Sequence, residues 1–499
     1  MVNFREQVFT SMNVLKTICP TCSTCCDGND EEKIGFAKYE RFDDSGHELD
    51  DANEWNQEKS EKKIVDEDNN DVDNKITEWQ AGWNVTNAIQ GMFIVSFPYA
   101  VLQGGYWAIV AMVLVAYICC YTGKILVQCL YEEDEMGRRV RVRNSYVEVA
   151  EEVLGKTIGG KIVNCAQLIE LLMTCILYVL LSGDLLDGSF PNLIDLSSWI
   201  VLSTFFLLPC AFLQSLRSVS RLSFWCSVAH MAINAIIIIY CLTQASAWKW
   251  KEVQIKIDIW TFPISLGIIV FSYTSQIFLP ALEGNLTNRK KFSCMMHVTH
   301  AAAAAFKAIF SYIGFLTWGI STQEVITNNL PTQTFKIIVN VILVAKALLS
   351  YPLPYYAAVD LIETSVFRGK GVSMVPSCLN ENKELKIWAV GLRFGLVLIT
   401  MFLAISIPYF AILMSLIGSF TGTMLSFVWP CHFHLRLRWY RLKWYEKLAD
   451  FTIILLGVVF GGIGIYYSAH ALARAVKGLP TDPHKMPTAP KLLKTDEVH

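Results

Sequence analysis

Charged residues are scarce in this sequence of 499 residues. They make up 17% of the chain, and 53% of the residues are hydrophobic, whereas a typical soluble domain is about 25% charged. This balance excludes a soluble enzyme, a nucleic-acid-binding protein or a disordered scaffold as the main interpretation. The net charge of −2 conceals a division, because residues 1–78 hold 20 acidic against 9 basic residues. The two parts of the chain are therefore expected to occupy different environments.

The motifs of common enzymes and pumps are also missing. Gly155-Lys156-Thr157 resembles the end of a phosphate-binding loop, but the glycine that this loop needs five residues earlier is Ala150. We find no convincing nucleotide-binding, zinc-protease or hydrolase motif, so the sequence disfavours an ATP-driven pump. We expect no enzymatic activity, no cofactor and no metal site. The first 18 residues also lack the long apolar core of a cleavable secretory signal.

Residues 1–78 are predicted to form an acidic, mostly disordered cytosolic tail. The stretch from 27 to 78 has too few apolar residues to offset the entropy cost of folding. A cysteine cluster in the tail could bind a metal or carry reversible lipidation, but no second cysteine or histidine pair follows it. The cluster consists of Cys19, Cys22, Cys25 and Cys26. The segment 31–36 combines acidic and hydrophobic residues in the way of a sorting signal, which an adaptor protein could bind.

From Trp79 onward, apolar stretches of about 20 residues recur, which is the length that a helix needs to cross a bilayer. The sequence therefore predicts an all-α polytopic membrane domain over 79–475, followed by a short lumenal tail over 476–499. About eleven transmembrane helices are expected, at 80–104, 106–130, 160–183, 197–215, 222–243, 260–282, 298–320, 334–364, 385–408, 410–433 and 449–473.

The distribution of basic residues predicts the orientation of these spans. The loops that follow spans 2, 4, 6, 8 and 10 lie on the side of the N-terminus and hold 19 Lys and Arg residues. Outside the C-terminal tail, whose basic residues are an exception, the opposite side holds only Lys249, Lys251, Lys256 and Lys336. Because basic residues favour the cytoplasmic side, we expect a cytosolic N-terminus and a lumenal or extracellular C-terminus.

Polar residues and prolines in the middle of two spans predict breaks in their helices. Span 1 carries Asn84, Asn87, Gln90 and Gly91 before Pro98, and span 6 carries a polar run from 272 to 276 before a second proline. Unwound backbone at this depth is tolerated only where it is buried or lines a cavity. The interval of five spans fits a five-plus-five inverted repeat with span 11 added. The alternative is that the polar residues only bond neighbouring helices and the prolines only kink them.

These segments resemble the amino acid/auxin permease family, which belongs to a superfamily of five-plus-five inverted-repeat transporters. The first-span motif ends in Ser96-Phe97-Pro98-Tyr99-Ala100. A vesicular branch of the family matches more closely, and the resemblance extends over roughly residues 80–470. The segments that carry it are Gly82–Phe93, Cys119–Leu126, Phe271–Pro280, Val344–Pro354 and Phe433–Leu437.

The resemblance implies a proton-coupled neurotransmitter transporter in the synaptic vesicle membrane. It would load GABA and glycine from the cytosol in exchange for lumenal protons, with a vesicular proton pump supplying the gradient. Chloride involvement stays open. The main alternative is a plasma-membrane amino acid transporter of the same superfamily that uses sodium or protons. A channel or receptor is disfavoured by the paired breaks.

The resemblance also implies that substrate binds at the two breaks, with spans 3 and 8 closing the site. The predicted substrate-binding residues are Asn87, Ala88, Gln90, Gly91 and Met92 in span 1, and Tyr273, Thr274 and Ser275 in span 6. Tyr273 could also shield a substrate amine by a cation–π contact. Where relatives usually have a small residue, this chain has Phe93, which we expect to reshape the pocket for a longer substrate.

Glu170 is the predicted proton-coupling residue. It lies near the centre of span 3, where an ionisable side chain is costly and indicates function. It could bind a lumenal proton and release it to the cytosol. The alternative is a structural ion pair with Lys307 or Lys346, which also lie in apolar spans. A fixed ammonium at Lys346 could in addition replace a sodium ion.

Overall fold

The computed structural model describes residues 77–133, 138–156, 158–209, 217–363, 387–477 and 479. The acidic tail up to residue 76, with its cysteine cluster and its sorting-like segment, lies outside these residues, and so does most of the predicted lumenal tail. The described residues fall into two compact units. The smaller consists of those up to Trp83 together with Leu282–Val298, and the larger consists of the remainder from Asn84 onward.

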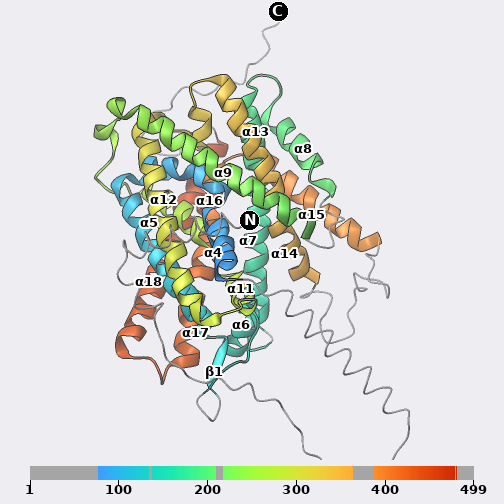
Figure 1. Ribbon diagram of the computed structural model, residues 1–499, viewed down its shortest axis with the longest axis vertical. Helices are drawn as coiled ribbons and strands as arrows, with labels where there is room; N and C mark the ends of the chain where they lie inside the picture. Colours follow the sequence, from blue (N-terminus) through green and yellow to red (C-terminus); the bar gives the residue numbers. More distant parts are fainter. Residues whose placement is uncertain are drawn as a thin grey trace, which may run out of the picture. The chain divides into compact units, whose positions relative to one another are not determined.

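Nearly all of the described chain is helical (Figure 1). The first helices are α4 (Glu78–Gln90), α5 (Phe97–Gln128), α6 (Tyr146–Leu154), α7 (Gly159–Ser189), α8 (Leu196–Phe205) and α9 (Arg217–Thr243). They are followed by α10 (Phe262–Tyr273), α11 (Leu279–Gly284), α12 (Phe292–Trp318), α13 (Gln333–Ser350), α14 (Pro352–Ile362), α15 (Ile387–Ser406), α16 (Phe410–Ile417), α17 (Trp429–Arg438) and α18 (Trp444–Val476).

Short helical turns connect or interrupt these helices. The 3₁₀ turns are η1 (Met92–Ser96), η3 (Ala245–Ala247), η4 (Trp250–Glu252), η5 (Arg289–Lys291), η6 (Gly319–Ser321) and η7 (Ile326–Asn329). Between α16 and α17 the backbone is π-helical over η9 (Gly418–Gly422) and η10 (Met424–Val428).

Seven helical stretches in the described part of the chain are long and apolar enough to cross a membrane. One of them, Glu78–Gln128, covers the first two predicted spans. Three further predicted spans coincide with the shorter apolar helices Leu196–Phe205, Ser227–Thr243 and Phe262–Tyr273. The helical membrane fold predicted from the sequence is therefore confirmed, whereas the count of eleven stays a prediction.

Spans 1 and 2 are joined without a loop, at a kink inside α5. Gly105 stands at this kink with φ of 57° and ψ of −144°. A Cβ atom there would lie 2.1 Å from the carbonyl oxygen of Gln254. Only glycine accepts this positive φ readily, so the residue permits both the turn and the close approach of the segment that precedes α10.

The loop between spans 2 and 3 departs from the predicted all-α fold. It forms a two-stranded antiparallel sheet, in which β1 (Tyr131–Glu133) pairs with β2 (Arg139–Arg141) (Figure 1). The register places Glu132 opposite Val140. Arg438 at the end of α17 donates to the carbonyl oxygen of Tyr131 at 3.3 Å, so the sheet is fastened to α17.

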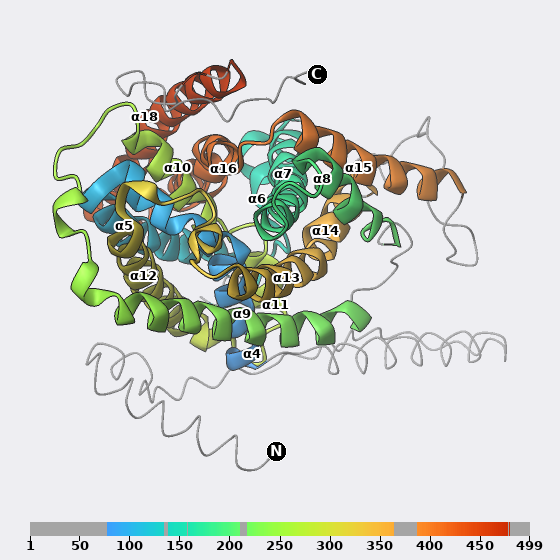
Figure 2. The same ribbon diagram turned by 90° about the horizontal axis from the view of Figure 1, so that it is seen from above.

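Close helix contacts position α10 in the interior of the larger unit. It packs on α5, α16 and α18, and Figure 2 shows α10 beside α16. A Cβ atom on Gly267 of α10 would lie 2.4 Å from the carbonyl oxygen of Ser415 of α16. Small residues permit such close backbone approach in membrane helices. On the other side of the unit, α7 packs on α13, α14 and α15.

Candidate substrate site at two broken helices

Span 1 is broken, as the sequence predicts. Its first part, α4, ends at Gln90, Gly91 forms a bend with ψ of −172°, and the chain resumes as the 3₁₀ turn η1. Pro98 stands in the first turn of α5, where its missing N–H group costs no helical hydrogen bond. The proline thus begins the second half of the span.

The predicted residues of span 1 gather at this break. Asn87 and Ala88 lie in the last turn of α4, Gly91 is the bend itself, and Met92 opens η1 with no exposed surface. The side chain of Gln90 lies outside the described part of the structure. The backbone around Gly91 is therefore available for hydrogen bonds that a continuous helix would have used.

Span 6 is broken in the corresponding place. α10 ends at Tyr273, the chain is not helical from 274 to 278, and α11 begins at Leu279. Tyr273 is 0% exposed and Ser275 is 2% exposed. Their hydroxyl oxygens are buried without a hydrogen-bond partner among the described residues. Because buried polar atoms are normally paired, these two hydroxyls are suited to a polar ligand. Thr274 bonds its own helix, at the carbonyl oxygen of Val270.

The side chain of Lys307 on α12 contacts the C-terminal end of α10. Its ammonium donates to the carbonyl oxygen of Ser272 at 3.0 Å and to the Ser272 hydroxyl at 2.9 Å. It also lies 3.7 Å from the centroid of the Tyr273 ring. The Tyr273 ring, which the sequence predicts to contact a substrate amine, is therefore already in contact with the ammonium of Lys307.

Lys346 on α13 joins three elements of the larger unit. Its ammonium donates to the hydroxyl of Ser227 on α9 at 2.7 Å and to Oδ1 of Asn87 at 3.5 Å. Ser227 also donates to Asn87 Oδ1, at 3.1 Å. The lysine thereby reaches the last turn of α4, next to the break in span 1.

Glu170 is buried in the middle of α7 and is 4% exposed. Its carboxylate accepts a hydrogen bond from the hydroxyl of Thr421 in η9. The described residues contain no ion pair between Glu170 and Lys307, which is bonded to Ser272 instead, and none with Lys346 is found among them. Each lysine instead lies on another helix with its own hydroxyl partner, Ser272 for Lys307 and Ser227 for Lys346.

Phe93 fills the space between the break of span 1 and three neighbouring helices. Its ring centroid lies 4.9 Å from that of Tyr178, 5.2 Å from that of Phe271 and 6.1 Å from that of Phe410. These partners come from α7, α10 and α16. The ring is thus placed where it limits the room beside η1, although its effect on substrate choice stays a prediction.

Gln276 organises the break of span 6 but was not among the predicted site residues. Its amide donates to the hydroxyl of Thr122 on α5 at 3.2 Å, and its carbonyl oxygen accepts from Ser426 in η10 at 2.8 Å. It lies inside the polar run that predicted the break, which was the available signal. Ser227 and Thr421 were also missed, because single hydroxyls in apolar spans are common.

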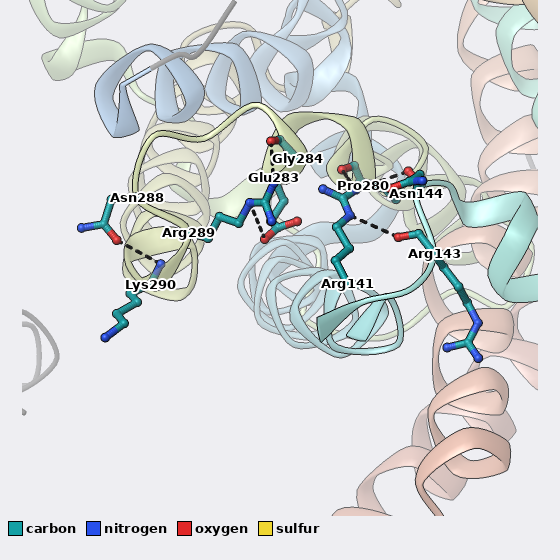
Figure 3. A network of polar contacts seen from close by, with 9 residues as sticks. All are labelled: Arg141, Arg143, Asn144, Pro280, Glu283, Gly284, Asn288, Arg289 and Lys290. Carbon is teal, nitrogen blue, oxygen red and sulfur yellow. Dashed lines mark hydrogen bonds and ion pairs between the residues drawn. The ribbon is translucent and has the colours of Figure 1, made fainter. Parts of the chain in front are cut away.

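At the end of the β-sheet where Tyr131 pairs with Arg141, the side chain of Arg141 contacts the start of α11. Its guanidinium donates to the carbonyl oxygen of Pro280 at 2.8 Å and to that of Arg143 at 3.1 Å (Figure 3). Within the smaller unit, Arg289 lies 3.9 Å from the carboxylate of Glu283.

The described residues contain no group of three or more His, Cys, Asp or Glu side chains that could hold a metal ion.

Comparison with known proteins identifies the family. The family model for transmembrane amino acid transporter proteins matches residues 74–470. The chain belongs to this family. The matched region of the transporter contains both broken spans and all the side chains described above.

Two curated relatives of the transporter are similar over most of their length. The vesicular inhibitory amino acid transporter of Xenopus tropicalis is 50% identical over 407 residues, which cover 81% of this chain and 78% of that protein. The vesicular GABA transporter of Caenorhabditis elegans is 47% identical over 416 residues, which cover 83% and 84%. Among solved structures, a Na⁺-coupled sialic acid symporter in a substrate-bound outward-open state matches at 12% identity and a TM-score of 0.46, over 81% of this chain and 91% of that one.

Proposed function

We propose that the transporter loads GABA and glycine from the cytosol into synaptic vesicles in exchange for lumenal protons. The observation that carries this proposal is the 50% identity to a vesicular inhibitory amino acid transporter over four-fifths of the chain. The proposal includes a multi-pass location in the vesicle membrane with a cytosolic N-terminus and a lumenal C-terminus. A separate proton pump supplies the gradient.

The geometry of the two breaks supports binding of a small amino acid. The interruption of the helix at Gly91 places backbone N–H groups where they suit a carboxylate, as in other transporters with discontinuous helices. The unpaired hydroxyls of Tyr273 and Ser275 offer further polar partners. An amino acid that satisfies these groups replaces the hydrogen bonds that they lack, which favours binding over an apolar ligand of equal size.

The surroundings of Glu170 support its role as the proton carrier. Among the described residues, its carboxylate contacts a hydroxyl and not a cation. A hydroxyl can donate to an ionised carboxylate and accept from a protonated one, so Thr421 serves both states. No fixed positive charge has to be left unpaired when the proton binds. The ammonium groups of Lys307 and Lys346 stand at the two breaks, which favours coupling to protons over coupling to sodium.

The proposal is tested with purified transporter in proteoliposomes. We expect uptake of labelled GABA to depend on an acidic interior and to be indifferent to sodium. Glu170→Gln should abolish this gradient-driven uptake, because the amide cannot exchange a proton. The same variant should retain exchange of labelled for unlabelled GABA without a gradient, which serves as the control for folding. Sodium-driven uptake by the parent would contradict the vesicular function, and full gradient-driven uptake by the variant would remove Glu170 from coupling.

A further inference from the structure

The loop between spans 7 and 8 carries a carboxylate that none of the mechanism above uses. This loop runs from η6 to the start of α13, and on the predicted topology it faces the lumen. Oε2 of Glu324 accepts the backbone N–H of Ala411, in the first turn of α16, at 2.9 Å. The carbonyl oxygen of Glu324 accepts the hydroxyl of Ser96, the last residue of η1, at 2.6 Å. One residue thus fastens the loop to the broken part of span 1 and to span 10.

A second pair of bonds fastens the same loop to the helices on its other side. Asn328 in η7 donates to the carboxylate of Asp184 on α7 at 2.9 Å. Its own side-chain oxygen accepts from Asn340 on α13 at 3.1 Å. The loop therefore bridges α7 and α13 to η1 and α16. These elements lie around the break of span 1, so a firmly held loop keeps them together on the lumenal side.

Among the described residues, no cation holds Glu324 in its ionised form. The side chains or backbone groups that meet the loop from η1, α13 and α16 are Ser96, Asn340 and Ala411, which carry no charge. The titratable groups around it are the phenol of Tyr99 on α5 and, through Asn328, the carboxylate of Asp184 on α7. Neither is positive in any protonation state.

We propose that Glu324 is a lumenal latch, a positioning residue that holds this loop in place when ionised and releases it when protonated. Substrate then leaves the site readily only into an acidified lumen. The proposal rests on the proton exchange proposed above and adds a second protonation event, at the exit. The step is a simple transfer, in which a lumenal proton binds the carboxylate and no other bond is made or broken covalently.

The chemistry of the contact gives the direction of the effect. A carboxylate accepts a backbone N–H more strongly than a neutral carboxylic acid does, so protonation weakens the bond to Ala411. Burial raises the pKa of Glu324 above its usual range. The latch is therefore held at neutral lumenal pH and is lost as the pH falls through the raised pKa, which needs less acid than an ordinary glutamate would.

The test compares Glu324→Gln with a matched control on the same side of the transporter. Glu252 also accepts a backbone N–H, that of Ile320 at 2.8 Å, but it touches neither η1 nor α16. Exchange of labelled for unlabelled GABA is measured in proteoliposomes with equal pH on both sides, so that no gradient drives it. In the parent and in Glu252→Gln, we expect exchange to accelerate roughly tenfold on acidification, a factor typical of two coupled sites.

Glu324→Gln should exchange rapidly at every pH, because its neutral amide resembles the released state. Ala411→Pro tests the other partner, since it removes the donated N–H at a helical position that tolerates proline. It should give the same rapid, pH-independent exchange. A parental pH profile in either variant, or an equal loss of the profile in Glu252→Gln, would overturn the latch. Absence of gradient-driven uptake in the parent would instead contradict the proposed function and leave this comparison intact.

Discussion

At the scale of single residues, Lys307 is predicted to stabilise the broken end of α10. Its ammonium satisfies both the carbonyl oxygen and the hydroxyl of Ser272. Lys307→Met keeps a side chain of similar length but removes the donor to the carbonyl oxygen of Ser272, at a cost of about 1–3 kcal/mol, whereas the Ser272 hydroxyl keeps its bond to the carbonyl oxygen of Ile269. We therefore expect a lower melting temperature of the detergent-purified transporter. Lys161→Met, at an exposed lysine of α7, is the control, and equal melting of both variants would contradict this role.

The charged side chains inside the membrane spans could be found from the sequence, whereas their hydrogen-bond partners could not. Glu170, Lys307 and Lys346 stand out because each interrupts an apolar span. Which groups they meet depends on how each helix is rotated and how deeply it packs, and no local pattern encodes that. The hydroxyls of Ser227 and Thr421 are decisive partners here, yet a serine or threonine in a membrane helix usually bonds its own backbone.

At the scale of elements, the β-sheet is predicted to restrain the start of α11. Arg141 reaches from β2 to the carbonyl oxygen of Pro280 (Figure 3). Hydrogen bonds to charged groups contribute about 1.5–3 kcal/mol, so Arg141→Ala should accelerate backbone amide exchange across residues 274–281 by roughly one to two orders of magnitude. Hydrogen-exchange mass spectrometry measures this change. Arg139→Ala removes an exposed arginine of the same strand and should leave the exchange unchanged, so identical rates in both variants would exclude the restraint.

The breaks of spans 1 and 6 were predictable because their causes are local. Polar residues, a glycine and a proline disfavour a continuous helix wherever they occur together in a membrane span. The segment from Gly418 to Val428 also holds glycines and hydroxyl residues and precedes Pro430, yet its backbone continues as a π-helix, which these local features do not predict. Its backbone follows from contacts with α10 and α18, which are distant in sequence. The β-sheet was missed for a similar reason, since its strands of three residues are too short to show an alternating pattern.

At the scale of the whole molecule, hydropathy was sufficient to predict a helical membrane domain. The stretches of about 20 apolar residues coincide with helices, because a chain in lipid must satisfy its backbone hydrogen bonds within each span. Segment boundaries were less certain where helices are kinked or interrupted. Spans 1 and 2 merge through α5 at Gly105, and span 8 divides into α13 and α14 around Tyr351. The division of span 8 follows from its proline, because Pro352 begins the new helix α14.

The charge division of the sequence leads to a final prediction, about orientation. The 19 basic residues in the loops after even-numbered spans oppose their transfer across the membrane. An epitope tag placed before Met1, or between Arg368 and Lys370, should therefore be cut by protease added outside intact synaptic-type vesicles. A tag placed after His499 should be cut only once detergent opens the membrane. Protection of the first two tags together with cleavage of the third would reverse the orientation, and with it the direction in which a proton on Glu170 or Glu324 could drive loading.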